Sequence, residues 1–106
     1  MAIIYHVTTR EEWIKATENG AYIAPSLEIE SFIHCSKSEQ VAGVLQRYFK
    51  GKVNLVRLTI DTDKLTASWQ FDLAPSINEA FPHVYGPINT DAVIEVTAIS
   101  SENESS

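Results

Sequence analysis

The sequence predicts one α+β domain, with a small split β-sheet of about six strands and two helices near the N-terminus. Two segments with helix-capping patterns lie in the first half of the 106-residue chain. The second half alternates apolar and polar residues in short runs, a pattern typical of strands. A chain of this length has room for one hydrophobic core, so the sheet must bury both helices on its faces. We therefore expect a single domain over residues 1–99.

The first strand is predicted over residues 3–8. Strand alternation places Ile3, Tyr5 and Val7 on one face and Ile4, His6 and Thr8 on the other. Thr9 and Glu12 have the spacing of a capping box, which predicts a helix that runs to about residue 19. Gly20 fits the left-handed position just beyond that helix.

The next elements are a connection, a strand and a second helix. Pro25 interrupts residues 22–30, so this stretch is predicted to be irregular, and long connections beside a site often belong to it. Residues 32–36 are predicted to be a buried strand that leads directly into a helix over residues 37–49. Ser36 and Glu39 form a second possible capping box at its start.

The second half supplies the remaining strands. Residues 53–61 form a near-continuous apolar run, which predicts a strand covered on both faces. Further strands are expected over residues 67–72, 84–88 and 92–99. The second of these is expected at an edge or a terminus, because Pro82 and Pro87 lack amide donors. The polar, acidic residues 100–106 are predicted to be disordered.

Charge and cysteine content narrow the function. Eight Lys and Arg against 14 Asp and Glu give a net charge of −6, so nucleic-acid binding is not expected and a small molecule or a protein is the expected partner. The single cysteine, Cys35, excludes an internal disulfide, and no metal-type cysteine spacing exists, so no metal site is predicted. No apolar run resembles a signal peptide or a membrane helix, so a cytoplasmic protein without membrane contact is expected. The oligomeric state is not predicted.

The three histidines lie in similar stretches, each near the end of a predicted strand. His34 shares its strand face with Ser36, beside a helix N-terminus with free backbone donors, and this combination suits an anionic ligand. His6 shares its face with Thr8 in the same way. His83 lies in a proline-bounded motif. Each histidine alone is also compatible with a purely structural role, and Ser36 with the role of a helix cap.

Four segments carry a resemblance to a known family: residues 5–8, 32–36 with Gln40 behind them, 58–61 and, above all, 81–88. Together they resemble the domain of unknown function 952 family over residues 3–96, with Ser31 where that family would be expected to have glycine. The resemblance implies an ADP-ribosyltransferase-like fold, in which a nicotinamide-dinucleotide cleft lies between the halves of a split sheet. His6 and His34 fall on the positions that grip the dinucleotide, as in the branch that contains the RNA 2′-phosphotransferases.

Three functions remain open at this point. The first is an enzyme that acts on a nicotinamide dinucleotide (NAD) or an ADP-ribose-like compound in a histidine-lined cleft, with His34, His83 and Tyr85 as catalytic candidates. In that hypothesis the ligand-binding residues are His6, Thr8, His34, Ser36, His83 and Tyr85. The second is a nucleotide-binding module without chemistry, because His83 and Tyr85 stand where protein-modifying transferases of this superfamily usually carry a glutamate. The third is a protein-interaction domain whose histidines are structural.

Overall fold

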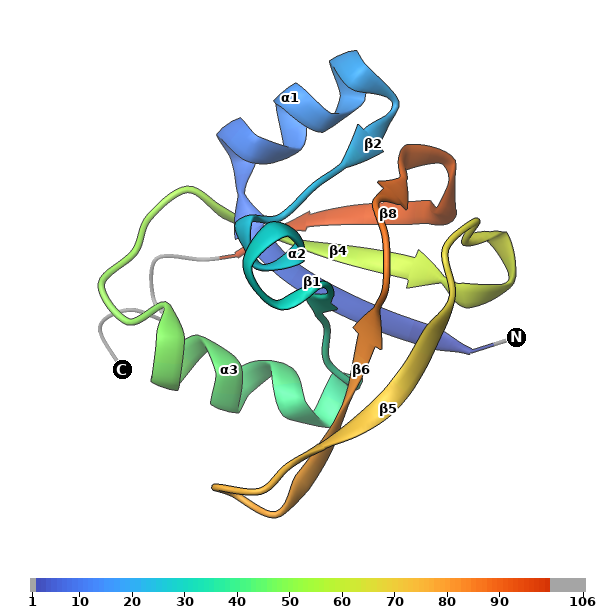
Figure 1. The fold of residues 1–106 in the computed structure, drawn as a ribbon. Coiled ribbons are helices and arrows are strands. Elements are labelled where there is room, and N and C mark those ends of the chain that lie inside the picture. The colour runs from blue at the N-terminus through green and yellow to red at the C-terminus, as the bar shows by residue number, and fades with distance from the viewer. Residues whose placement is uncertain (1, 100–106) are drawn as a thin grey trace.

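Three small antiparallel sheets and three α-helices make up residues 2–99, the part of the chain that the computed structural model describes (Figure 1). The α+β class is confirmed, although one helix more than predicted is present. The predicted disordered segment 100–106 lies outside the described residues. Among residues 2–99, no helix is long and apolar enough to cross a membrane.

The first sheet has the order β1-β4-β8, with β1 spanning Ile3–Thr9, β4 Leu55–Asp61 and β8 Val93–Ala98. The central strand β4 is buried along nearly its whole length, as its apolar run predicts. The register pairs His6 of β1 with Leu58 of β4, so His6 lies on the face that carries the main core. The predicted strand faces of β1 are confirmed.

Helix α1 (Arg10–Asn19) has both predicted ends. The Thr9 hydroxyl oxygen accepts a hydrogen bond from the Glu12 amide at 3.1 Å, and this bond satisfies one of the free donors of the first turn. Gly20 ends the helix in the left-handed conformation, with φ of 81°. Local capping chemistry therefore fixes both ends of α1.

The prediction of an irregular connection over residues 22–30 is wrong, because strand β2 (Ala21–Tyr22) is followed by helix α2 (Pro25–Glu30). Pro25 begins this helix instead of interrupting it. At the first helical position the missing amide hydrogen would have had no partner, and the fixed φ of proline suits the helix. Ser31 then ends α2 with φ of 74°, a conformation that favours the glycine expected there.

Helix α3 (Val41–Tyr48) follows a 3₁₀ turn over Ser38–Gln40, close to the predicted span. The predicted cap at Ser36 is wrong. The chain is still extended at Ser36, whose backbone pairs with Tyr5 of β1, and the helical segment begins later. The cap function is served by Gln40, whose side-chain oxygen accepts from the Lys37 amide at 2.9 Å.

Strands β3 (Ile33–His34), β6 (Glu79–Val84) and β5 (Trp69–Ala74) form the second sheet, and β7 (Ile88–Asn89) pairs with β2. The predicted edge strand over residues 84–88 is therefore wrong, since Pro82 lies inside the central strand β6. The Pro82 carbonyl accepts from the Cys35 amide at 2.9 Å, but proline cannot return the second bond of that pair. This explains why the pairing of β3 with β6 stops there.

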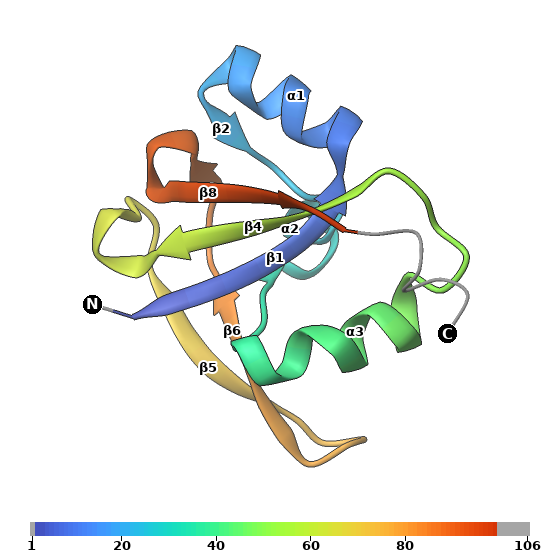
Figure 2. The same ribbon diagram turned by 180° about the vertical axis from the view of Figure 1, so that it is seen from behind.

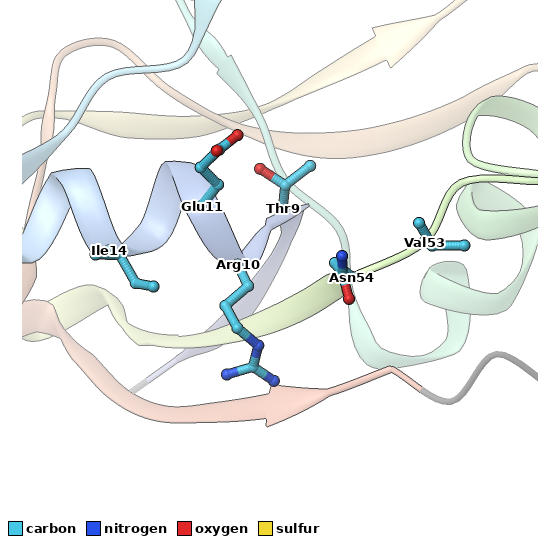
Figure 3. A pocket seen from close by; sticks show the side chains of 6 residues that line it. All are labelled: Thr9, Arg10, Glu11, Ile14, Val53 and Asn54. Carbon is cyan, nitrogen blue, oxygen red and sulfur yellow. The ribbon is translucent and has the colours of Figure 1, made fainter.

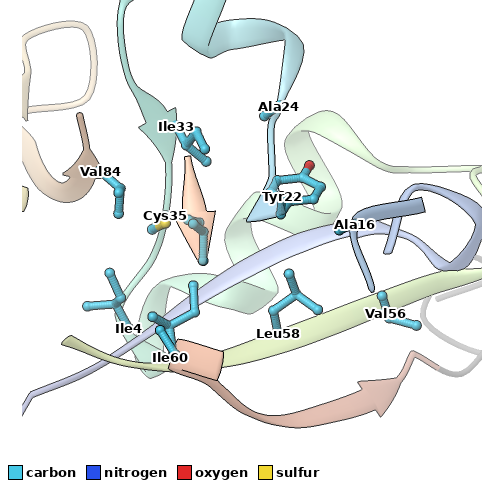
Figure 4. Close-up of a cluster of buried hydrophobic side chains, with 12 residues drawn as sticks. Ile4, Ala16, Tyr22, Ala24, Ile33, Cys35, Val56, Leu58, Ile60 and Val84 are labelled. Atoms are coloured by element: carbon cyan, nitrogen blue, oxygen red, sulfur yellow. The ribbon is translucent and has the colours of Figure 1, made fainter. Parts of the chain in front are cut away.

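The main core lies between the first sheet and the elements that cover it (Figure 4). Its fully buried side chains include Ile4, Ile33, Leu58, Ile60, Val84 and Ile88. A smaller cluster of Val7, Val41 and Leu55 lies under α3, on the other face of the same sheet. Phe49 packs on this cluster, whereas Tyr48, although it belongs to the apolar stripe of the helix, is exposed.

Candidate functional site

The pairing of β3 with β6 brings His34 and His83 together. The two residues are direct cross-strand partners, and their ring centroids lie 5.1 Å apart with the ring planes nearly perpendicular. Their neighbours Ile33 and Val84 pair on the opposite face and are completely buried. Because successive side chains alternate between faces, the burial of this apolar pair turns both histidines outward.

Asp72 of β5 holds the ring of His83. His83 Nδ1 lies 2.8 Å from Asp72 Oδ2, and the Tyr85 hydroxyl donates to the same oxygen. Gln70 Nε2 donates to the other carboxylate oxygen at 2.7 Å. These bonds, the one from Tyr85 most strongly, lower the pKa of Asp72, and the bond to Asp72 raises the pKa of Tyr85. A neutral His83 therefore carries its proton on Nδ1 and has a free lone pair on Nε2.

His34 is held in a similar way by Glu30, the last residue of α2. Its Nε2 lies 2.8 Å from Glu30 Oε2, and the two side chains are 54% and 47% exposed. The pair is therefore screened by solvent and contributes little stability. It does fix the ring, because a neutral His34 that donates from Nε2 has its lone pair on Nδ1.

Phe32 joins the two histidines. Its ring stacks on His83, with centroids 4.0 Å apart and planes 12° from parallel, and it contacts the edge of His34 at 4.9 Å. The centroid of the Tyr85 ring lies 5.6 Å from that of Phe32. We refer to Glu30, Phe32, His34, Asp72, His83 and Tyr85 together as the histidine surface.

His6 lies beneath this surface and reaches it through the backbone. Its Nδ1 donates to the carbonyl oxygen of His34 at 2.6 Å, and its Nε2 lies 2.9 Å from the hydroxyl oxygen of Tyr22. That hydroxyl is in turn 3.1 Å from Thr8 Oγ1. Burial lowers the pKa of His6 to about 4, so the ring is neutral at pH 7. Both ring nitrogens thus have partners inside the protein.

The predicted site residues therefore form two groups. His34, His83 and Tyr85 lie together on the histidine surface, whereas His6 and Thr8 are linked to each other by Tyr22 below it. Ser36 is buried, and its backbone exchanges two hydrogen bonds with Tyr5.

Sequence reasoning did not assign four residues to this site: Glu30, Phe32, Asp72 and Tyr22. The alternating pattern of β5 places Asp72 on its polar face, but only the register with β6 brings that carboxylate to His83. Glu30 lies in the segment that the sequence predicts to be irregular, so its position at the end of a helix beside His34 could not be inferred. Tyr22 carried no local signal, because its partners His6 and Thr8 come from another strand.

Two hollows lie elsewhere on the molecule. One, of about 470 Å³, is at the start of α1 and is lined by Thr9, Arg10, Glu11, Ile14, Val53 and Asn54 (Figure 3). The other, of about 270 Å³, lies along α1 and β2 and touches Tyr22. Neither contains His34 or His83, and the side chains drawn in Figure 3 combine one cation, one anion and two exposed apolar groups without a shared focus.

Metal and thiol chemistry gain no support from the arrangement. Within residues 2–99, no three His, Cys, Asp or Glu side chains are grouped so as to hold a metal ion. Cys35 is buried in the main core, and burial raises the pKa of its thiol, so the reactive thiolate is disfavoured.

Comparison with known proteins gives a family and a fold. The chain is similar to protein CC0527 from Caulobacter crescentus, whose crystal structure matches with a TM-score of 0.84 at 26% identity over 93% of this chain and 87% of that one. The solution structure of CC0527 matches with a TM-score of 0.78 at 25% identity, over 97% and 90% of the two chains. No curated protein matches the sequence. The model of DUF952, described as a protein of unknown function, matches residues 7–96, and the chain therefore belongs to this family.

Proposed function

We propose that the chain is an ADP-ribosyltransferase-like domain that binds a nicotinamide dinucleotide or an ADP-ribose-like compound on the histidine surface and acts on it by acid–base chemistry. One observation carries the proposal. His34 and His83 lie side by side, and a carboxylate engages one nitrogen of each ring. The motif resemblance described above supplies the class of ligand.

Each carboxylate orients one imidazole ring and determines which ring nitrogen carries the proton. Each fixes a tautomer, which leaves the lone pairs of His83 Nε2 and His34 Nδ1 free to accept hydrogen bonds from ribose hydroxyls. A ring that takes up a proton at its free nitrogen can later return it, so each imidazole can act first as a base and then as an acid. His83 is the better candidate for this role, because its side chain is 12% exposed and that of His34 is 54% exposed.

The lower group of residues supports this surface without direct contact to the ligand. Because both nitrogens of His6 are engaged, its contribution is to hold the His34 backbone, and Thr8 acts through Tyr22. The ligand-binding roles predicted for His6 and Thr8 would require these contacts to open, and the role predicted for Ser36 would require its buried side chain to become exposed. The roles of His34, His83 and Tyr85 would not.

Nucleotide binding without chemistry is the alternative, and one observation favours it. Both His83 and Tyr85 direct a hydrogen bond to the same Asp72 oxygen, so neither presents that proton to a ligand. A surface of this kind can recognise a ribose or a base by accepting hydrogen bonds and by stacking while no proton is transferred.

A two-stage experiment tests the proposal. ¹H–¹⁵N NMR titrations with NAD and with ADP-ribose should shift amides of β3 and β6, and nicotinamide release should then be followed by chromatography. His34→Ala and His83→Ala should each weaken binding at least tenfold, whereas Tyr48→Ala, an exposed aromatic on α3, should bind as the wild type does. Chemical-shift changes without release of nicotinamide would support nucleotide binding without chemistry. Absence of shifts at the histidine surface with both compounds would overturn the proposal.

A further inference from the structure

A second polar group lies on the other face of the β1-β4-β8 sheet. Arg57 and Thr59 are two residues apart on β4 and therefore project from the same face, opposite to Leu58 in the core. The register places Tyr5 of β1 and Glu95 of β8 on either side of Thr59. In Figure 2 the strands β1, β4 and β8 are in front, and α3 lies beside them without crossing β4.

Two side-chain donors on this face of the sheet, one from Arg57 and one from Thr59, lack hydrogen-bond acceptors. Arg57 Nε and Thr59 Oγ1 are the buried side-chain atoms without a hydrogen-bond partner among residues 2–99. Thr59 as a whole is only 7% exposed, so bulk water does not readily compensate for the missing bond. Buried polar groups in folded proteins are nearly always paired, so two orphaned donors on one strand face need an explanation.

The charge of Arg57 is also unbalanced within the described part of the chain. Its guanidinium carbon lies 5.0 Å from the centroid of the Tyr5 ring, a contact that orients the group but does not neutralise it. No ion pair joins it to a carboxylate among residues 2–99, although the chain carries 14 Asp and Glu. The planar guanidinium fork is suited to oxyanions, and a threonine hydroxyl adds one more donor.

From these observations we infer that Arg57 and Thr59 form a binding site for one tetrahedral oxyanion, either inorganic phosphate or the phosphate group of a phosphomonoester. Both donor atoms are covered in this structure, so the anion reaches them only when the Arg57 side chain turns away from the Tyr5 ring. Two residues along a strand span roughly 7 Å, a distance that one such anion can bridge between two side-chain donors. A polyanion does not fit the surroundings, because the chain has a net charge of −6. This site is separate from the histidine surface and does not depend on the function proposed for it.

Glu95 is the internal competitor for the same donors. It lies directly across from Thr59 on β8 and is exposed, so a turn of its side chain could bring the carboxylate to Arg57 or Thr59. Removal of this charge by Glu95→Gln should strengthen binding of an external anion if the anion occupies the site.

The test is an NMR titration of the full chain with sodium phosphate at constant ionic strength, with sodium chloride as the ionic control. Amides around Thr59 should shift and saturate with phosphate alone. Thr59→Val, which keeps the side-chain shape, should weaken binding about tenfold, and Arg57→Gln should weaken it further, because a hydrogen bond to a charged group is lost in each case. His34→Ala should bind phosphate as the wild type does, which separates this site from the histidine surface.

A parallel titration with adenosine monophosphate distinguishes the two sources. Saturation by either compound supports the site and identifies the form of phosphate that it takes. Three outcomes would overturn the inference: shifts that never saturate, shifts that map to the histidine surface instead of β4, or binding that appears only in Glu95→Gln. Binding that appears only in Glu95→Gln would mean that Arg57 and Thr59 interact with the Glu95 carboxylate in the wild-type protein.

Discussion

The Nδ1 of His6 donates a hydrogen bond to the carbonyl oxygen of His34 at 2.6 Å, and this bond ties the first strand to the strand that carries the histidine surface. A carbonyl oxygen can only accept, so the proton of a neutral His6 must reside on Nδ1. Its Nε2 is then an acceptor and needs the single hydroxyl proton of Tyr22. Thr8 must in turn donate to Tyr22. The four groups form a chain of hydrogen bonds with one consistent direction.

The protonation of His6 gives the first prediction. Nitrogen-15 NMR of the imidazoles at pH 7 should show His6 protonated on Nδ1 and bare on Nε2, and this pattern should persist until the pH approaches its lowered pKa of about 4. His34, which is exposed and bonded through Nε2, serves as the internal control for the opposite tautomer. A His6 proton on Nε2 would contradict the direction of the chain.

The same pKa predicts how stability depends on pH. The pKa of His6 is about 4 in the native state and 6.5 in the unfolded state, so below pH 6.5 the unfolded chain binds a proton that the native protein does not. The free energy of unfolding should therefore fall as the pH drops from 6.5 to 4, by about 1 to 3 kcal/mol from this residue. Urea unfolding at several pH values measures the trend, and His6→Gln should reduce it. An equal slope in the variant would exclude His6 as the cause.

Tyr22→Phe tests the middle of the chain. The hydroxyl is buried between His6 and Thr8, so its removal leaves the His6 acceptor without a donor, at a cost of about 1 to 3 kcal/mol. Tyr48→Phe removes the same atom from a side chain that is 66% exposed, and should change stability by less than about 0.5 kcal/mol. Chemical unfolding of both variants gives the comparison. Equal losses would mean that the buried hydroxyl is not structurally important.

The core assignment predicts a contrast between two leucines. Leu58 is completely buried in the centre of the first sheet, and Leu58→Ala should cost about 2 to 5 kcal/mol through lost burial and the remaining cavity. Leu73 lies on the β5–β6 hairpin and is 59% exposed, so Leu73→Ala should cost less than about 0.5 kcal/mol. Thermal or urea unfolding measures both. A small loss for Leu58→Ala would contradict the position of the core.

Elements that depend on local chemistry could be predicted from the sequence, and those that depend on distant partners could not. Thr9 and Gly20 fix the ends of α1 through bonds to their own helix, and the apolar run of β4 predicts its two covered faces. Pro25 is ambiguous by contrast, because proline both interrupts and begins helices, and the contact of Leu27 of α2 with the main core is not visible in the local sequence. Pro82 can lie inside a central strand because its missing amide hydrogen falls where the pairing with β3 stops, and that partner strand lies far away in the sequence.

In the histidine surface, too, local features could be predicted from the sequence, whereas contacts between distant segments could not. Alternation along residues 32–36 predicted only that His34 shares a strand face with Ser36. The approach of His83, however, depends on the register with β6. To place Asp72 beside His83, the register of β5 with β6 must be known as well. The carboxylate that orients His83 was therefore the residue least accessible to sequence reasoning.

Asp72→Asn tests this last contact. Tyr85 donates to the Asp72 carboxylate, and that bond raises the pKa of the Tyr85 hydroxyl because ionisation would place two negative charges together. An amide at position 72 removes the charge, so Tyr85 should ionise at lower pH in the variant, as measured by the absorbance of tyrosinate or by NMR of the ring. His83 can still donate from Nδ1 to the new amide oxygen, so the orientation of its ring should persist. Glu30→Gln neutralises the other carboxylate of the histidine surface, which bonds His34 and not Tyr85, and should leave the Tyr85 titration unchanged. An identical Tyr85 pKa in Asp72→Asn and the wild type would show that the hydroxyl and the carboxylate do not meet in solution.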